Sequence, residues 1–362
     1  MAAVLLFLTL DAAIFRSGFY SGYLEPNSTT GQVEYHLIWL RRAPRANVPE
    51  VVVVGDSRIA EGFSARTAEA AVQGKLHFTN DGMPGSSPRV WYYFLRDADP
   101  KRDRFSRIVL ALDHYADEDA EENLSDRPSD LNYLAVRLKP WDCYEFAHSF
   151  YDRKIRSGIL GGCLFPGTVL RPDVLSFLSN IPDRVARAND WREKGAGYVD
   201  GYGGKDEELT GLTVDEEKRE IHFPPNLKDW QINAVRSTVL PGTAAQTGSL
   251  TRYRKLWLGR ILDLYKGTGT TIVFLQIPRA PWPIPDSKVP ARFLDSVAGQ
   301  KGVEVLPEGT FKNLETPELF ADGLHLNHKG RPIFSTMLAE RLSEASRRVS
   351  TRHAGVRAPQ AE

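Results

Sequence analysis

Residues 51–57 read Val-Val-Val-Val-Gly-Asp-Ser, and this stretch decides the expected fold. Four consecutive β-branched residues without polar alternation are typical of a parallel strand that is buried on both faces. Ser57 then lies at the carboxyl end of that strand, where open α/β sheets bind their ligands, and its backbone N–H can face an anion. The alternative is purely structural, because Asp56 and Ser57 are also common helix caps.

Strand-like and helix-like segments alternate on both sides of this stretch. The expected strands are 51–54, 75–80, 107–112, 271–277 and 302–306, and the expected helices are 64–72, 88–97, 250–265 and 330–349. The alternation predicts an α/β fold with a mainly parallel sheet that helices cover on both faces. It stops between residues 116 and 249, so we expect a large insertion there, partly helical, for example over 131–138.

Three further segments flank the main domain of residues 51–350. Residues 25–50 begin with turn formers and predict a linker, and residues 351–362 have the composition of a disordered tail. Residues 1–24 open with an apolar run that is shorter than the roughly 20 residues of a bilayer span. We favour a membrane anchor or uncleaved signal, and thus an extracytoplasmic, periplasmic-side domain, over a buried helix of a cytoplasmic protein.

Composition narrows the classes of partner and cofactor. Lys+Arg and Asp+Glu are balanced at 46 each, so the formal net charge is zero and no nucleic-acid footprint is expected. Cys143 and Cys163 are too few for a disulfide scaffold, and neither has a second ligand at metal-site spacing. Two unpaired buried thiols are favoured over a bridge, and the sequence predicts neither a metal nor an organic cofactor.

A second motif lies near the carboxyl end of the chain, where residues 320–330 read Phe-Ala-Asp-Gly-Leu-His-Leu-Asn-His-Lys-Gly. Asp322 and His325, three residues apart on a tight turn, can face the same way. The carboxylate can then hold the imidazole by Nδ1–H and leave Nε2 free to take a proton from a serine. Each residue alone would be interpreted as structural, but together with Ser57 they predict a catalytic triad. The polar neighbours of His328 favour a solvent-facing loop instead.

The two motifs resemble those of the SGNH (GDSL-type) hydrolase superfamily, whose first block is Gly-Asp-Ser and whose last block is Asp-x-x-His. Residues 55–57 match the first block, and Asp322 with His325 match the last, in the family's order. The resemblance implies a three-layer α/β/α flavodoxin-like fold. It also implies acyl-ester chemistry in which Ser57 attacks, His325 acts as base and then acid, and Asp322 orients His325.

The resemblance also identifies the groups expected to bind the oxyanion. Residues 80–87, Asn-Asp-Gly-Met-Pro-Gly-Ser-Ser, resemble the family's second block. Gly85 falls where the family's glycine donates its N–H to the oxyanion, and Gly82 is a rival for that role. The N–H of Ser57 is the other backbone donor that we expect.

The third block departs from the family's pattern. Where the family has Gly-x-Asn-Asp, residues 112–117 read Leu-Asp-His-Tyr-Ala-Asp, so the asparagine that supplies a side-chain oxyanion donor is absent. Tyr115 falls nearest to its position. The Tyr115 hydroxyl, or the His114 ring, can donate in its place.

A narrower resemblance concerns substrate and partner. The aromatic residue after the third strand, the insertion and the apolar N-terminus are similar to extracytoplasmic, membrane-anchored SGNH proteins near the alginate O-acetyltransferase group. That similarity implies acetyl transfer to or from polysaccharide hydroxyls, beside a membrane acyltransferase. Arg58 can bind an acidic sugar or be an ordinary ion-paired residue. The alternative function, favoured by the missing asparagine, is a catalytically weak SGNH-fold module that binds polysaccharide or the partner.

Overall fold

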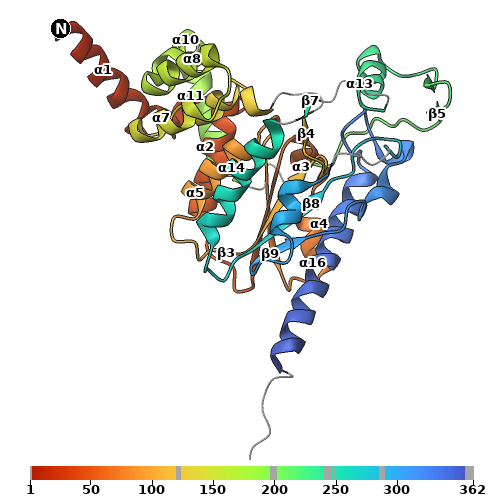
Figure 1. Cartoon of the computed structure of the whole chain (residues 1–362). Coiled ribbons are helices and arrows are strands. Elements are labelled where there is room, and N and C mark those ends of the chain that lie inside the picture. Colours follow the sequence, from red (N-terminus) through yellow and green to blue (C-terminus); the bar gives the residue numbers. More distant parts are fainter. Residues whose placement is uncertain are drawn as a thin grey trace, which may run out of the picture.

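The computed structural model describes residues 2–119, 124–195, 202–239, 246–247, 249–284 and 290–354. Within them, a five-stranded sheet of order β2-β1-β3-β8-β9 forms the centre, and each neighbouring pair of strands is parallel (Figure 1). The strands are β1 (Glu50–Gly55), β2 (His77–Gly82), β3 (Phe105–Leu112), β8 (Thr271–Gln276) and β9 (Val303–Val305). The expected α/β fold with a mainly parallel sheet is confirmed.

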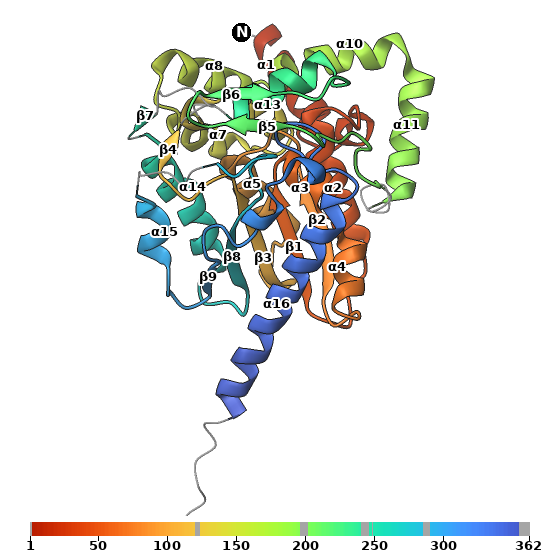
Figure 2. The ribbon, with the colours of Figure 1, turned by 90° about the vertical axis from the view of Figure 1, so that its right-hand side faces the viewer.

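Helices cover both faces of the sheet, as the apolar strands require. In β1, Val51 and Val53 face one core and Val52 and Val54 face the other, and all four side chains are fully buried. The Val52 face packs against α2 (Thr29–Arg42), α5 (Pro88–Ala98), α14 (Ser249–Tyr265) and α15 (Arg292–Val297). The opposite face packs against α3 (Ser57–Gly62), α4 (Ala65–Ala71) and α16 (Gly330–Ala354), as Figure 2 shows for α4 and α16.

The strand order reverses at β1, which has β2 on one side and β3 on the other. In open parallel sheets of this kind, ligands bind in the crevice beyond the carboxyl ends of the strands at the reversal. Ser57 follows β1 after one residue, and Asp113 follows β3 directly. The fold therefore brings the first and third sequence blocks to one edge of the sheet.

The segment 25–50, predicted to be a linker, is part of the core. Its centre forms α2, which begins after the capping residue Ser28. Val33, Leu37 and Leu40 recur at helical spacing and are buried in the core on the α2 side of the sheet. The linker prediction is wrong because it gave weight to the turn formers at the start of the segment and overlooked the apolar periodicity after them.

The insertion between β3 and β8 has a helical part and a smaller part beside the sheet. The helical part contains α6 (Asp130–Leu134), α7 (Pro140–His148), α8 (Arg153–Leu164), α9 (Pro166–Val169), α10 (Arg171–Ser179) and α11 (Ile181–Lys194). The smaller part contains a hairpin of β5 (Thr213–Asp215) and β6 (Glu220–His222), followed by α13 (Asp229–Val239). Residues 118–119 (β4) also pair with residues 246–247 (β7).

A disulfide between Cys143 and Cys163 links α7 to α8. Both residues are fully buried, and their Cα atoms are 5.5 Å apart. The expectation of two unpaired thiols is therefore wrong. A sequence separation of 20 residues does not reveal that α7 and α8 pack side by side.

The first and last described helices lie at opposite ends of the molecule. The N-terminal helix α1 (Ala2–Phe15) projects beside the helical part of the insertion, whereas α16 points away from it (Figure 1). Among the described helices, none has the length and apolar character needed to cross a membrane. Residues 351–354 of the expected tail are helical because α16 runs to Ala354, and residues 355–362 lie outside the described part of the chain.

Candidate active site

Three side chains from opposite ends of the sequence meet at the carboxyl edge of the sheet. The Ser57 Oγ lies 2.8 Å from His325 Nε2, and His325 Nδ1 lies 2.9 Å from both carboxylate oxygens of Asp322. A carboxylate can only accept, so Nδ1 carries the proton of a neutral imidazole and Nε2 accepts from the serine hydroxyl. The structure thus brings together the predicted serine, histidine and aspartate in hydrogen-bonding order.

The turn between Ala321 and Leu326 fixes the Asp322 carboxylate. Its Oδ1 accepts hydrogen bonds from the backbone N–H groups of Leu324 (2.8 Å) and His325 (2.9 Å). Burial alone raises the pKa of Asp322, but the bonds from His325 and Leu324 and the charge of Lys205 outweigh it, so this pKa lies well below its ordinary value. Asp322 is therefore ionised and can orient His325.

Lys205 is a site residue that the sequence did not indicate. Its Nζ lies 3.1 Å from Asp322 Oδ2 and 2.9 Å from Glu61 Oε2, and Glu61 stands on α3, one turn beyond Ser57. Burial lowers the pKa of Lys205, but the two carboxylates raise it above its ordinary value. Lys205 belongs to the insertion, 117 residues from Asp322, and no recognisable motif surrounds it. Only the folded chain reveals that it joins both halves of the triad.

The second sequence block forms a loop against the end of β1. The Gly55 carbonyl accepts hydrogen bonds from the Met83 N–H (2.9 Å) and the Ser86 hydroxyl (3.1 Å). Gly85, within this loop, has a φ of +72°, and a Cβ there would lie 2.7 Å from the Tyr133 hydroxyl oxygen. Both features favour glycine.

The two expected backbone donors are free to bind an anion. Within the described part of the chain, neither the Gly85 N–H nor the Ser57 N–H has an acceptor. The rival, Gly82, already donates its N–H to the Asn80 side-chain oxygen at 3.0 Å. Of the two glycines, only Gly85 retains the donor that the predicted role requires.

Asn80 has a role that its position in the second block did not reveal. Its Nδ2 donates to the carbonyls of Ile59 (3.0 Å) and Phe63 (2.8 Å), while its oxygen accepts from Gly82. This fully used, buried amide ties the end of β2 to α3. Asn80 therefore holds the helix that begins with Ser57.

The prediction that Tyr115 donates to the oxyanion is wrong. The Tyr115 hydroxyl is buried and points to backbone carbonyls of the sheet, 2.8 Å from the Leu306 oxygen and 3.2 Å from the Phe274 oxygen. A phenol has a single proton, so none remains for an oxyanion. The alternative, His114, has its Nδ1 2.7 Å from the Ala116 carbonyl.

Arg58 follows the nucleophile but is paired with acidic residues. Its guanidinium lies 2.7 Å from Asp56 Oδ2 and also bonds the Asp113 carboxylate. Its side chain is 13% exposed, and these two carboxylates raise its pKa although burial lowers it. This is the ion-paired arrangement that the sequence left open. The pairing fixes the loop after β3 against the start of α3.

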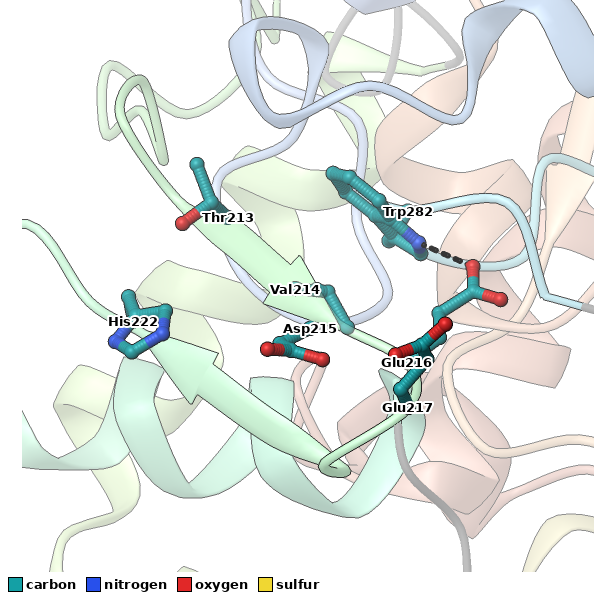
Figure 3. A pocket seen from close by; sticks show the side chains of 7 residues that line it. All are labelled: Thr213, Val214, Asp215, Glu216, Glu217, His222 and Trp282. Carbon is teal, nitrogen blue, oxygen red and sulfur yellow. Dashed lines mark hydrogen bonds between the residues drawn. The ribbon is translucent and has the colours of Figure 1, made fainter.

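An open pocket of about 530 Å³ lies between the β5–β6 hairpin and the loop that leaves the carboxyl end of β8. Figure 3 shows Trp282 across from the hairpin, with its indole N–H 3.1 Å from a Glu216 carboxylate oxygen. Asp215, Glu217 and His222 also line it. The next helix, α13, contacts the catalytic turn through a hydrogen bond of 2.8 Å from the Gln231 amide to the Ala321 carbonyl.

Comparison with known proteins adds no relative to this description. No protein-family model matches the chain, and no curated protein matches it significantly. Any functional conclusion therefore depends on the geometry of the site and on the sequence motifs.

Proposed function

We propose that this protein is an SGNH-type serine enzyme that hydrolyses or transfers acyl esters. The observation that carries the proposal is the continuous hydrogen-bonded series from the Ser57 hydroxyl through His325 to Asp322, with separations of 2.8 and 2.9 Å. A hydroxyl on a helix N-terminus, a base within bonding distance and an ionised group behind that base are what activation of a serine nucleophile requires.

The steps follow from the positions of these groups. As Ser57 Oγ attacks the ester carbonyl carbon, His325 Nε2 takes the hydroxyl proton, and Asp322 stabilises the resulting imidazolium. The N–H groups of Ser57 and Gly85 bind the oxyanion of the tetrahedral intermediate. His325 then protonates the departing alcohol oxygen, which leaves an acyl-serine. Water or a second hydroxyl, deprotonated by His325, attacks this ester and releases Ser57.

The missing third oxyanion donor supports a slower enzyme and also favours the second candidate, a weakly catalytic binding module. The family's asparagine is absent, and the Tyr115 hydroxyl is bonded to backbone carbonyls. Loss of one oxyanion donor costs about 2.7–4 kcal/mol of transition-state stabilisation in known enzymes. The intact series of Ser57, His325 and Asp322 favours the enzyme, because a binding module has no need of it.

The charge near the nucleophile favours a neutral substrate such as an acylated carbohydrate. Four carboxylates and two cations belong to the ion pairs that join α3, the loop after β3 and the catalytic turn, and both cations are paired. They are Asp56, Glu61, Asp113, Asp322, Arg58 and Lys205. The half-buried indole of Trp282, which lines the open pocket, offers the kind of apolar surface on which sugar rings stack. An acidic sugar bound by Arg58, one of the sequence-based expectations, is less compatible with this charge distribution.

An extracytoplasmic location at a membrane belongs to the same proposal. The disulfide between Cys143 and Cys163 supports an oxidising compartment, where such bonds persist. The apolar sequence of α1 supports association with a membrane. A membrane acyltransferase that supplies the acyl group remains a proposed partner.

The test is reaction of the folded protein with a fluorophosphonate, with the adduct located by mass spectrometry. We expect labelling of Ser57, loss of labelling in Ser57→Ala, and slow hydrolysis of p-nitrophenyl acetate that Ser57→Ala abolishes. The matched control is Ser237→Ala. Ser237 is exposed on α13, and its hydroxyl donates a hydrogen bond to the Ala234 carbonyl of the same helix. Equal turnover by wild type and Ser57→Ala would contradict the proposed function.

A further inference from the structure

Exposed apolar side chains are concentrated at one end of the molecule. Twelve large apolar side chains of the described residues are exposed. Of these, only Trp230 and Ile333 lie outside the N-terminal segment and the helical part of the insertion. The other ten are Leu6, Leu10, Ile14, Phe19, Trp141, Tyr144, Leu164, Leu175, Leu178 and Ile181. Scattered exposed apolar residues are normal, but a concentration of this kind marks a surface that contacts a membrane or another protein.

The elements that carry these residues form one end of the molecule because α1 is fastened to the insertion. The Asp11 carboxylate accepts a hydrogen bond of 2.9 Å from the Gly167 N–H, and the Arg16 guanidinium bonds the carbonyls of Leu138 and Cys163. Phe15 packs in a small core with Leu170 and their neighbours. Figure 1 shows α1, α7, α8 and α10 gathered at this end, with the first turns of α1 projecting beyond the others.

Exposed cations border the apolar side chains. Arg153, Lys154 and Arg171 are exposed; Lys154 interacts with the neighbouring Asp152 carboxylate, and neither Arg153 nor Arg171 forms an ion pair within the described residues. Between residues 153 and 179, Asp173 is the single acidic residue, and it is already bonded to Arg184 at 3.0 Å and to the Tyr20 hydroxyl. Apolar residues bordered by exposed Lys and Arg match the acyl chains and the anionic headgroups of a lipid surface.

Two exposed aromatic residues on α7 fit the same environment. Trp141 is 72% exposed and Tyr144 is 66% exposed, and both rings combine an apolar body with a polar group. Trp and Tyr are enriched at the boundary between acyl chains and headgroups for this reason.

We propose that α1 and helices α7 to α10 form a single membrane-binding surface, which rests on a bilayer that contains anionic phospholipid. The insertion helices lie in the interface and α1 enters it, so membrane attachment does not depend on α1 alone. The insertion leaves the sheet after the carboxyl end of β3, and residues 246–247 at its end pair with residues 118–119 beyond that same edge, where Ser57 lies. The catalytic edge is consequently held on the membrane side of the sheet. The binding surface itself does not depend on the proposed catalysis.

The test is co-sedimentation of the full chain with vesicles of phosphatidylcholine, with and without phosphatidylglycerol. We expect wild-type protein to bind, and to bind better when phosphatidylglycerol is present. The double substitution Leu175→Glu with Leu178→Glu, on α10, leaves α1 intact and should weaken binding at least about tenfold, because two exposed apolar side chains no longer enter the interface. Arg153→Glu with Lys154→Glu should remove the preference for phosphatidylglycerol.

Matched controls keep the test decisive. Ile333→Glu and Trp230→Glu alter the two exposed apolar residues outside this surface and should leave vesicle binding unchanged. Circular dichroism and p-nitrophenyl acetate hydrolysis report whether each variant is folded. Unchanged binding of the folded Leu175→Glu, Leu178→Glu protein would overturn the proposal, because α1 alone would then account for attachment. So would binding to membranes that contain a protein partner but not to protein-free vesicles.

Discussion

The sheet buries its apolar side chains, whereas the helical part of the insertion exposes several of them. The four valines of β1 are fully buried, and the polar groups at the end of the strand are hydrogen-bonded around the triad. On α10, by contrast, Leu175 and Leu178 are 56% and 60% exposed. A buried parallel sheet provides a rigid support for chemistry, whereas an exposed apolar surface is useful only to a partner outside the chain. The difference predicts that substitutions in the two regions have separable effects.

The largest effect is expected from Asp322→Asn. A neutral amide cannot stabilise the imidazolium of His325, nor keep the imidazole in the tautomer that accepts from Ser57, so kcat for p-nitrophenyl acetate should fall about 10⁴-fold. Asp295→Asn, an exposed aspartate on α15, is the control and should leave kcat unchanged. The change at Asp322 should not affect vesicle binding. A folded Asp322→Asn protein with more than a tenth of wild-type kcat would show that the carboxylate is not needed.

The next largest effect concerns the insertion. Replacing both Cys143 and Cys163 by alanine removes a link that closes a loop of 20 residues, and should lower the free energy of unfolding by about 3 kcal/mol. Hydrogen exchange should accelerate in α7 and α8 and stay slow in β1 and β3, while turnover of the soluble ester is retained. Parallel loss of exchange protection in the sheet would mean that the two regions unfold as one unit. Substitutions in them would then not have separable effects.

The same division explains how much could be predicted from sequence. Each strand of the central sheet was predicted to within a few residues, and the clearest signal came from fully buried strands, which leave an uninterrupted apolar run such as 51–54. The helix α2 was missed within 25–50, where turn formers precede the apolar periodicity. The helix-to-helix packing that joins Cys143 to Cys163 was also missed, since packing between elements leaves no local pattern.

The candidate site shows the same limit. Ser57, Asp322 and His325 could be predicted because each lies in a short motif next to a strand or a tight turn. Lys205 could not, because its contact with Asp322 spans 117 residues and is made by a segment of the insertion without a motif. Tyr115 was predicted by its position in the block alone, and position does not reveal where a side chain points.

A smaller effect is expected for Lys205→Met. Lys205 belongs to the insertion and contacts the Asp322 carboxylate at the edge of the sheet. The pKa of Asp322 in the folded chain lies below the ordinary 3.8, so the folded state binds the proton less readily than the unfolded state. Its stabilising contribution is therefore present above that ordinary value and is lost as the pH falls through the folded pKa. Without the Lys205 charge the contribution shrinks, and the free energy of unfolding at neutral pH should fall by about 1 kcal/mol.

Urea unfolding at several pH values checks this expectation for Lys205. The difference between wild type and Lys205→Met should narrow only as the pH falls towards the folded pKa of Asp322, well below the ordinary 3.8, where that carboxylate becomes protonated. Lys205→Arg retains the positive charge and should behave like wild type. A difference that is independent of pH would mean that Lys205 acts through packing and not through its charge.

The smallest effect on activity is expected for Tyr115→Phe, which tests the corrected oxyanion assignment. The substitution removes the hydrogen bond of 2.8 Å to the Leu306 carbonyl and should lower the free energy of unfolding by about 1 kcal/mol. Because this hydroxyl faces the sheet and not the nucleophile, kcat should change less than about twofold. Removal of a true oxyanion donor would instead lower kcat by a factor of about 10² to 10³.

Gly85→Ala is the variant to compare with Tyr115→Phe. It strains a φ of +72° in the loop that carries the second oxyanion donor and should reduce kcat far more than Tyr115→Phe does. A large loss of kcat in Tyr115→Phe would mean that this hydroxyl does bind the oxyanion. The physical reason for expecting a slow enzyme would then be gone.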